Sequence, residues 1–353
     1  MRYKSFDCVK GICCIAVILI HYNFPGDLGI AIKTVFRFAV PCFLAISGFF
    51  FASSDGMCYR KNCIRKIKHI LNLIIRGGSF YIVFDVLWNM MLNSNWQMRV
   101  YILEKVTLAK TVKLILTNDP FVYAHLWFLL ALFYCYLCCM LFREKTYPRK
   151  LVKIYPVLLL LFFSYALWKE KLGISASIPI KIGNSEANIM KFNFFFLRAL
   201  PWFFMGMYLR LKEENIRKLS IRKDILIAAI LFGSVWSVFE RALFLESQFY
   251  MGTCVVVSAL LIWAIKFFNM GTNWLEFIGK NLSLYVYIIH IAVGKSYDLF
   301  VTKCFPKSIK SNLYIYNRPF LIICTSLLIA YAIYATKLNI KKRKLVDEME
   351  KIL

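Results

Sequence analysis

The hydrophobic positions of the sequence gather into long apolar runs, and short polar or basic segments separate one run from the next. A helix needs roughly 20 predominantly apolar residues to cross the hydrocarbon core of a bilayer. Runs of this length therefore predict transmembrane helices. The predicted fold class is an all-α integral membrane protein, a bundle of about ten transmembrane helices. The expected spans are residues 8–24, 34–52, 70–92, 122–142, 151–168, 192–209, 225–240, 249–268, 277–294 and 318–336.

The bundle is predicted to occupy residues 1–336 as one domain, because no internal repeat or linker interrupts the series of apolar runs. Residues 337–353 form a short basic tail with an amphipathic pattern, which we expect to lie against the inner leaflet. The first run follows a basic start, as a signal peptide would. Lys10 and His21 interrupt it, however, and no cleavage site of small residues follows, so we interpret it as a membrane span.

Composition narrows the class of protein further. Of the 353 residues, 60% are hydrophobic and 18% are charged, whereas a soluble globular domain carries about 25% charged residues. These values exclude an intrinsically disordered chain, a secreted disulfide scaffold and a water-soluble domain. The predicted localisation is the cell membrane, which the chain crosses several times.

The charge of the chain is strongly positive, with 45 Lys and Arg residues against 19 Asp and Glu residues. In a soluble protein this excess would suggest a nucleic-acid partner. Here the basic residues cluster between apolar runs, which indicates contact with anionic lipid and the orientation of the bundle. The densest clusters, Arg60–Lys68, Arg143–Lys153 and Lys341–Lys344, fall on one side of the predicted bundle. Both termini are therefore predicted to be cytoplasmic, with membrane lipids and no nucleic acid as partners.

The 12 cysteines predict neither a metal site nor a disulfide framework. Most of them lie within apolar runs, where Cys behaves as a small hydrophobic residue. Cys135 and Cys138 form one C-x-x-C pair, but no second ligand pair at zinc spacing accompanies it. We expect no bound metal and no permanently bound cofactor.

Two ionisable residues in the first span, Lys10 and His21, are candidates for function because charged and titratable groups are costly inside a bilayer. They are eleven residues apart, about three helical turns plus 20°, so they share one helix face and lie roughly 16 Å apart along its axis. Lys10 would lie near the cytoplasmic end and His21 near the outer end. A neutral imidazole there can accept a hydroxyl proton or become acylated. The alternative is that both side chains extend to the lipid headgroups.

The surroundings of these two residues resemble the start of the membrane acyltransferase-3 family, which typically has a basic residue ten intervening positions before a His. Four further segments resemble motifs of the same family and occur in the same order, so the resemblance covers nearly the whole chain, from residue 2 to about residue 336. The five segments are Phe6–Gly11 with His21, Val40–Phe50, His125–Leu129, Leu200–Gly206, and Gly279–Tyr285 with His290.

The resemblance implies an enzyme that moves an acyl group, most often acetyl, from cytoplasmic acyl-CoA to a hydroxyl of a cell-surface or lipid-linked glycan. By position, His21 would be the catalytic residue and Lys10 the basic residue of the donor site. Ser47 and Gly48 would also face the donor. Many members have Arg where this chain has Lys10, so point-charge attraction replaces bidentate recognition of the donor.

Several other residues are candidates for substrate binding. Arg65 and Lys66 would contact the CoA phosphates together with Lys10. His125 would bind the acceptor, or would anchor its helix at the interface together with a neighbouring Trp. Glu240 would orient the acceptor, or would form a local ion pair with the adjacent Arg.

His290, the last of these candidates, lies deep within a predicted span. There it would line a polar pocket or form a hydrogen bond between helices. Asp85 and Arg76 of the third predicted span are expected to have partners on other helices. No extra hydrolase-like domain, which some family members carry, is expected, so acceptor binding would fall to the spans, the outer loops or a partner.

A transporter of a glycan or of a lipid-linked sugar is the alternative function. Many spans, aromatic walls and intramembrane histidines are compatible with it, but the paired Gly- or Pro-broken spans typical of such transporters are not apparent. A scaffold without chemistry would leave the face shared by Lys10 and His21 unexplained. The sequence does not choose between acetyl, succinyl and longer acyl groups, and it does not identify the acceptor sugar.

Overall fold

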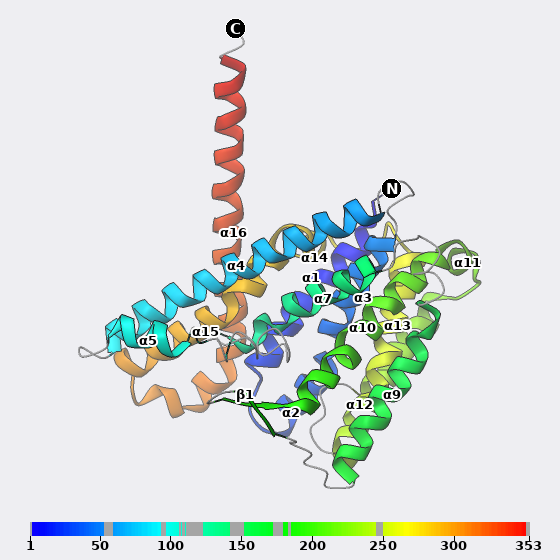
Figure 1. Cartoon of the computed structure of the whole chain (residues 1–353), viewed down its shortest axis with the longest axis horizontal. Helices are drawn as coiled ribbons and strands as arrows, with labels where there is room; N and C mark the ends of the chain where they lie inside the picture. Colours follow the sequence, from blue (N-terminus) through cyan, green and yellow to red (C-terminus); the bar gives the residue numbers. More distant parts are fainter. Residues whose placement is uncertain are drawn as a thin grey trace. The chain divides into compact units, whose positions relative to one another are not determined.

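A computed structural model describes residues 2–52, 59–92, 97–105, 107, 110, 123–141, 152–171, 179–182, 185–244 and 250–350. Helices make up most of this part of the chain (Figure 1). The chain divides into two compact units. The first consists of Met1–Cys42, Ser220–Leu243 and Gln248–Leu353, and the second of Phe43–Leu219 with Phe244–Ser247.

Helix α1 (Lys4–His21) is the centre of the first unit, and it packs against five other helices. Phe6, Val9 and Ile18 on different sides of it are all fully buried. Apolar side chains on several sides of one helix are buried only when other helices surround it. Its neighbours are α2 (Gly26–Phe36), α13 (Met251–Lys266), α14 (Asn273–Phe277), α15 (Ser283–Cys304) and α16 (Asn312–Glu350).

Two glycines allow α1 to approach α14 and the π-helical turn η4 (Ile278–Leu282) closely. A methyl group on Gly11 would lie 2.3 Å from the carbonyl oxygen of Leu275. A methyl group on Gly279 would lie 1.8 Å from the carbonyl oxygen of Asp7. Only a residue without a side chain fits at either position, so the first and last family-like segments of the sequence meet at one helix crossing.

Farther along α1, apolar side chains join it to α15 and α16. Ile18 packs in one cluster with Val286 and Ile289 of α15 and with Ile322 of α16. Helix α16 has 39 residues, which corresponds to roughly 58 Å against about 30 Å of hydrocarbon core. Part of it must therefore extend beyond the membrane. The predicted tail at 337–353 continues α16 as one helix as far as Glu350 (Figure 1).

The remaining elements of the first unit are α12 (Lys223–Phe244) and the short helix η5 (Ser308–Lys310). Helix α12 meets α13 where Gly233 and Gly252 lie against each other. A methyl group on Gly252 would be 2.2 Å from the carbonyl oxygen of Gly233. This contact is the second close helix crossing that depends on glycine in this unit.

The second unit is also mainly helical. Its longest helix, α4 (Tyr59–Leu92), packs against α7 (Trp127–Leu141), and α10 (Ile189–Leu211) packs against α7 and α9 (Tyr155–Lys171). Helix α3 (Ala39–Ala52) begins in the first unit and enters this one at Phe43. The short elements are α5 (Met98–Lys105), η2 (Ala124–Leu126), η3 (Val152–Ile154), α11 (Glu213–Lys218) and the antiparallel pair β1 (Pro179–Ile182) and β2 (Ser185–Asn188).

Aromatic rings fill the core of this unit where α3, α7 and α10 meet. Phe51 lies 5.3 Å from Tyr136 and 5.9 Å from Phe203 between ring centroids. Gly48 of α3 faces Phe203, and a methyl group there would lie 2.0 Å from its carbonyl oxygen. Gly206 of α10 faces α3 in the same way, since a methyl group on Gly206 would lie 1.8 Å from the carbonyl oxygen of Ala45. The second and fourth family-like segments therefore form a single helix crossing.

All ten predicted spans are mainly helical where the structure describes them, but residues 22–24, 37–38, 123, 250 and 267–268 are not helix. The edges at 122, 142, 151 and 249 lie outside the described residues. Six helical segments in the described residues are long and apolar enough to cross a membrane, so the helical membrane fold is confirmed at this level. The number of crossings and the cytoplasmic termini stay predictions. The six segments are Gly26–Ala52, Tyr59–Leu92, Ala124–Leu141, Lys223–Leu243, Asn273–Cys304 and Asn312–Arg343.

Three features differ from the sequence prediction. Helix α2 begins at Gly26, ahead of the predicted span at 34–52, and helix α4 begins at Tyr59 rather than at residue 70. The β1–β2 hairpin lies between two predicted spans, where the sequence predicts no strand. The basic residues at the start of α4 are good helix formers, so the helix extends beyond its apolar run. Hydropathy locates the part of a helix that lipid covers, not the point where the helix ends.

Candidate active site

The structure brings two histidines together at the C-terminal end of α1. The ring centroids of His21 and His290 are 5.2 Å apart, and the planes of the two rings are inclined by 47°. His21 is exposed, whereas His290 of α15 is fully buried. The two histidine rings thus lie against each other, and residue His21 keeps accessible surface while His290 does not.

Helix α15 itself fixes the orientation of the buried ring. Nδ1 of His290 lies 3.0 Å from the carbonyl oxygen of Val286 and 2.9 Å from that of Tyr287. A carbonyl oxygen only accepts hydrogen bonds, so we assign the proton of the neutral ring to Nδ1. Nε2 is then the nitrogen through which His290 can accept a proton.

His21 is the last residue of α1 because the backbone leaves the helical conformation at Tyr22, whose N–H still bonds to the carbonyl of Ile18. Pro25 then precedes the first turn of α2. Lys33 of α2 lies within electrostatic range of His21. Nothing in the sequence singles out Lys33, because its proximity to His21 depends on how α2 folds back after α1, and spacing alone gives no signal for it.

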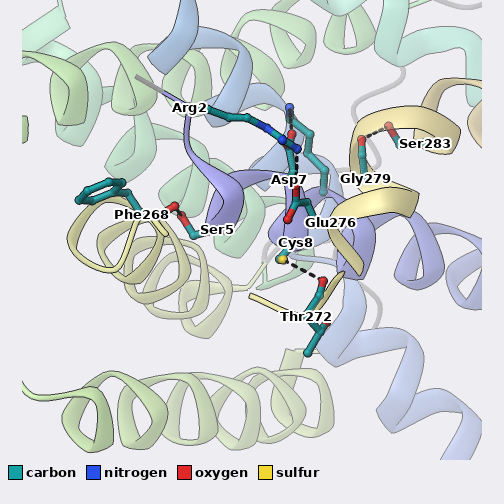
Figure 2. A network of polar contacts seen from close by, with 10 residues as sticks. Arg2, Ser5, Asp7, Cys8, Phe268, Thr272, Glu276, Gly279 and Ser283 are labelled. Carbon is teal, nitrogen blue, oxygen red and sulfur yellow. Dashed lines mark hydrogen bonds and ion pairs between the residues drawn. The ribbon is translucent and has the colours of Figure 1, made fainter. Parts of the chain in front are cut away.

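The N-terminal half of α1 carries Lys10 within a polar network; Arg2, Asp7 and Glu276 of this network are labelled in Figure 2. The Lys10 ammonium lies 3.1 Å from the Asp7 carboxylate, and the Arg2 guanidinium lies 3.6 Å from the same carboxylate. Arg2 is also paired with Glu276 of α14. Two cations and two anions thus share this end of the helix. The spacing of Asp7 and Lys10 could have predicted their contact, whereas nothing in the sequence indicates the contact with Glu276.

The same end of α1 is anchored by two further side chains (Figure 2). The hydroxyl of Ser5 donates to the carbonyl of Ala264, at 2.6 Å, and lies 3.2 Å from that of Phe268. The thiol of Cys8 donates to the carbonyl of Thr272 at 3.6 Å. These contacts attach the start of α1 to α13 and to the segment before α14, so the position of Lys10 is fixed by several neighbours.

Ser47 and Gly48, predicted to face the donor, lie within α3 in the second unit. The Ser47 hydroxyl donates to the carbonyl of Phe43 one turn earlier, at 2.8 Å. Gly48 forms the crossing with α10 described above. The structure gives Gly48 a packing role, and a role in donor binding stays a prediction.

Arg65 and Lys66 lie in the first turns of α4, also in the second unit. Arg65 is exposed and donates to the side-chain oxygen of Asn62 at 2.7 Å, whereas Lys66 is half-buried. Their basic cluster is therefore part of a helix and not of a loop.

His125 lies in η2 and is buried among aromatic rings. Its ring is 5.0 Å from that of Tyr81, edge to face, and 6.0 Å from that of Tyr123. Asp85 of α4 accepts hydrogen bonds from the hydroxyls of Tyr101, at 2.7 Å, and Tyr123, at 2.8 Å. Burial and the hydrogen bond to the Asp85 carboxylate raise the pKa of Tyr101, so its hydroxyl stays a neutral donor. These tyrosines, from other elements, are the expected type of partner for Asp85.

Glu240 lies near the end of α12 and is largely buried. Its carboxylate accepts the backbone N–H of Gly252, at 3.2 Å, in the first turn of α13. A carboxylate at this position satisfies an unpaired N–H group and interacts favourably with the helix dipole. Through this hydrogen bond, Glu240 caps the N-terminus of α13.

The structure groups only some of the predicted site residues. Lys10, His21, Glu240 and His290 belong to the first unit, and within it only His21 and His290 are in contact. The others belong to the second unit. Within the described part of the chain, no group of three or more His, Cys, Asp or Glu residues is placed to hold a metal ion. The arrangement suits proton transfer or acyl transfer at the exposed imidazole of His21.

Comparison with known proteins identifies a family for the chain. No curated protein and no solved structure gives a significant match to the chain. The sequence profile of the acyltransferase-3 family, described as an acyltransferase domain, matches residues 3–336. This match covers the histidine pair, Lys10 with Asp7 and Glu276, and both helix crossings formed by the family-like segments. The chain therefore belongs to the acyltransferase-3 family of membrane proteins.

Proposed function

We propose that the chain transfers an acyl group, in the first instance acetyl, from cytoplasmic acyl-CoA to a hydroxyl of a cell-surface or lipid-linked polysaccharide. Membership of the acyltransferase-3 family supports acyl transfer by a membrane protein in general terms. The observation that carries the proposal for the catalytic residue is the contact between exposed His21 and buried His290. A histidine held in this way is suited to general acid–base or nucleophilic catalysis.

The donor is proposed to extend along α1. Lys10 and His21 share one helix face and lie roughly 16 Å apart along the axis. Negatively charged phosphates of the donor would lie near Lys10, and the thioester would reach His21. Because Asp7 and Arg2 already surround Lys10, a phosphate would join a network of fixed charges there.

Two chemical routes are compatible with this arrangement. In the first, His21 takes the proton of the acceptor hydroxyl while the hydroxyl oxygen attacks the thioester carbonyl. The C–S bond then breaks, and the CoA thiolate takes the proton from the imidazolium. In the second, an imidazole nitrogen of His21 attacks the carbonyl, the C–S bond breaks, and the N–H proton of the ring passes to the CoA thiolate, which leaves as the thiol. The acceptor hydroxyl then attacks the acyl-imidazole, and its proton passes to the freed ring.

His290 is proposed to orient His21 in either route. Its own orientation is set by the carbonyls of Val286 and Tyr287, and its ring lies directly against that of His21. Through Nε2 it can also accept a proton from the His21 ring. His290 would therefore affect the rate of transfer more than the binding of the donor.

The proposal is tested in membranes that contain the chain, given acetyl-CoA labelled in the acetyl group and the glycan fraction of the host. Free CoA and label in the glycan are followed together. We expect His21→Ala to abolish both at equal protein level, since a substitution at the exposed end of one helix leaves the bundle intact. His69→Ala is the matched control, because His69 is an exposed histidine of α4 with no part in the proposed reaction.

The same assay separates the routes and the alternative function. Release of CoA and labelling of His21 without any acceptor would select the acyl-imidazole route, and a strict need for acceptor would select the general base. Full acyl transfer by His21→Ala would refute the role of His21. If neither acetyl-CoA nor succinyl-CoA is consumed while labelled glycan crosses the membrane, the chain is a transporter and the proposal fails.

A further inference from the structure

A cluster of polar and aromatic side chains beside His21 has no part in the reaction proposed above. It consists of Tyr22, which follows α1, of Asp298 near the end of α15, and of Tyr314 and Arg318 near the start of α16. All four belong to the first unit. Charged groups in or near a membrane are costly, so a cluster of this kind calls for an explanation.

Tyr22 links the chain segment that contains His21 to the segment that contains His290 through a hydrogen bond. Its hydroxyl donates to the carbonyl of Ile291 at 3.0 Å. Tyr22 directly follows His21, and Ile291 directly follows His290. The Tyr22 side chain is only 6% exposed, so water does not readily compete for this hydrogen bond. The bond therefore ties the two chain segments together within one residue of the histidine pair.

The ring of Tyr22 is itself held by two neighbours. It packs on Gly294, where a methyl group would lie 2.0 Å from Cζ of the ring. The guanidinium carbon of Arg318 lies 4.9 Å from the ring centroid, a distance typical of a cation–π contact. Gly294 is therefore needed to make room for the ring, and Arg318 covers part of it.

Arg318 is fixed in turn by Asp298. Its Nε and Nη2 atoms donate to the two carboxylate oxygens at 2.7 and 2.5 Å, a bidentate pair. The hydroxyl of Tyr314 donates to the same carboxylate at 2.7 Å. A bidentate pair fixes the plane of a guanidinium as well as its position. Arg318 is thus held in one orientation against Tyr22.

We propose that Tyr22 is a positioning residue that holds His21 against His290, and that the Asp298–Arg318 pair holds Tyr22. The start of α1 is anchored independently through Ser5 and Cys8, and Ile18 packs against α15 and α16. The Tyr22 hydroxyl adds a hydrogen bond within one residue of the histidine pair. The effect on catalysis rests on the proposed acyl transfer, whereas the effect on the geometry of the histidine pair does not.

The first test is kinetic and uses Tyr22→Phe, which removes one oxygen atom and keeps the ring. We expect kcat to fall roughly tenfold to a hundredfold, since small displacements of catalytic groups have effects of this size. The KM for acyl-CoA should stay unchanged, because the donor phosphates bind at the distant end of α1. Tyr331→Phe, an exposed tyrosine of α16, is the matched control. A merely structural loss would instead lower the amount of protein and raise KM.

The second test does not require activity. Diethyl pyrocarbonate modifies accessible imidazoles, and mass spectrometry identifies the modified residue. In the wild-type chain we expect modification of His21 and protection of His290. Tyr22→Phe and Arg318→Gln should increase modification of His290 severalfold, whereas Tyr331→Phe should not.

The two tests separate the failure of this inference from the failure of the proposed function. Wild-type kcat together with full protection of His290 in Tyr22→Phe would overturn the positioning role. If the wild-type chain transfers no acyl group but His290 loses its protection in Tyr22→Phe, the positioning role stands and the proposed function is wrong.

Discussion

A buried carboxylate near the end of a helix can bind a substrate or cap another helix. Glu240 is a residue of this kind. Its position in the sequence allows both. Its hydrogen bond to the N–H of Gly252 favours the cap, because the first N–H groups of a helix have no partner within the helix.

The cap predicts a loss of stability without a loss of activity. Replacement Glu240→Gln removes the charge that interacts with the dipole of α13, and we expect the free energy of unfolding to fall by about 1 kcal/mol. The melting temperature in detergent measures this change, and the rate of acyl transfer should stay near that of the wild type. Asp224→Asn is the comparison, because Asp224 is an exposed acidic residue in the first turn of α12, where loss of the charge should cost less than at the largely buried Glu240. An unchanged melting temperature with a raised KM for the acceptor would make Glu240 a ligand of the acceptor.

Lys10 presents a related question at the same scale. Its pairing with Asp7 gives its charge a local partner, which is sufficient to explain a lysine in the first span without any substrate. The network is only partly buried, and the Arg2 and Lys10 side chains are 49% and 26% exposed against 13% for Asp7. The two cations are therefore the more accessible members of the network, which is compatible with the approach of a phosphate.

At the scale of helices, glycines decide which elements can approach each other. Gly48 and Gly206 each lie within van der Waals distance of the backbone of the opposite helix. Packing of this kind is common between membrane helices, where lipid provides no hydrophobic force for association and close contact must supply the energy. The motif that contains Ser47 and Gly48 thus has a structural use whether or not it also contacts the donor.

This crossing predicts that Gly48→Ala destabilises the second unit. The added methyl group would lie 2.0 Å from a backbone oxygen, and relief of such overpacking typically costs 1–3 kcal/mol, roughly the range we expect here. Thermal unfolding in detergent measures the loss. Gly78→Ala in α4 is the control, since a methyl group there meets nothing within 4 Å and should be neutral or slightly stabilising. If Gly48→Ala retains its melting temperature and raises the KM for acyl-CoA, Gly48 contacts the donor instead.

At the scale of the whole chain, the proposed reaction depends on orientation. In that proposal the donor would be cytoplasmic and the acceptor would face outward, so we expect the Lys10 end of α1 to face the cytoplasm and the His21 end to face the outside. The distribution of Lys and Arg predicts this orientation. It also predicts that the segment between α15 and α16 is external.

Cys304 provides a native probe of this orientation, because it is exposed and lies at the end of α15. We expect a thiol reagent that cannot cross membranes to label Cys304 in intact cells, and Cys304→Ser to remove this label. Lys342→Cys, in the part of α16 beyond the predicted span, should be labelled only after the cells are permeabilised. Labelling of Cys304 only after permeabilisation would show that the chain has the opposite orientation.

The sequence by itself determined the class of the protein, the approximate position of the helices and the shared face of Lys10 and His21. These features follow from local composition and helical periodicity. In lipid, a backbone without water must satisfy its hydrogen bonds within each segment, so a sufficiently long apolar run becomes a helix whatever its neighbours are. The family-like segments were recognisable for the same reason, since each one is continuous in sequence.

Only the tertiary structure decided which segments meet. The contacts of Gly11 with α14, of Gly48 with α10 and of His21 with His290 join residues far apart in the sequence. Hydropathy carries no information about them, because apolar helices resemble one another to lipid and pair through shape and a few polar contacts. For this reason the sequence could nominate His21 as the catalytic residue, but His290, Tyr22 and Arg318 acquire their relation to it only when α1, α15 and α16 pack together.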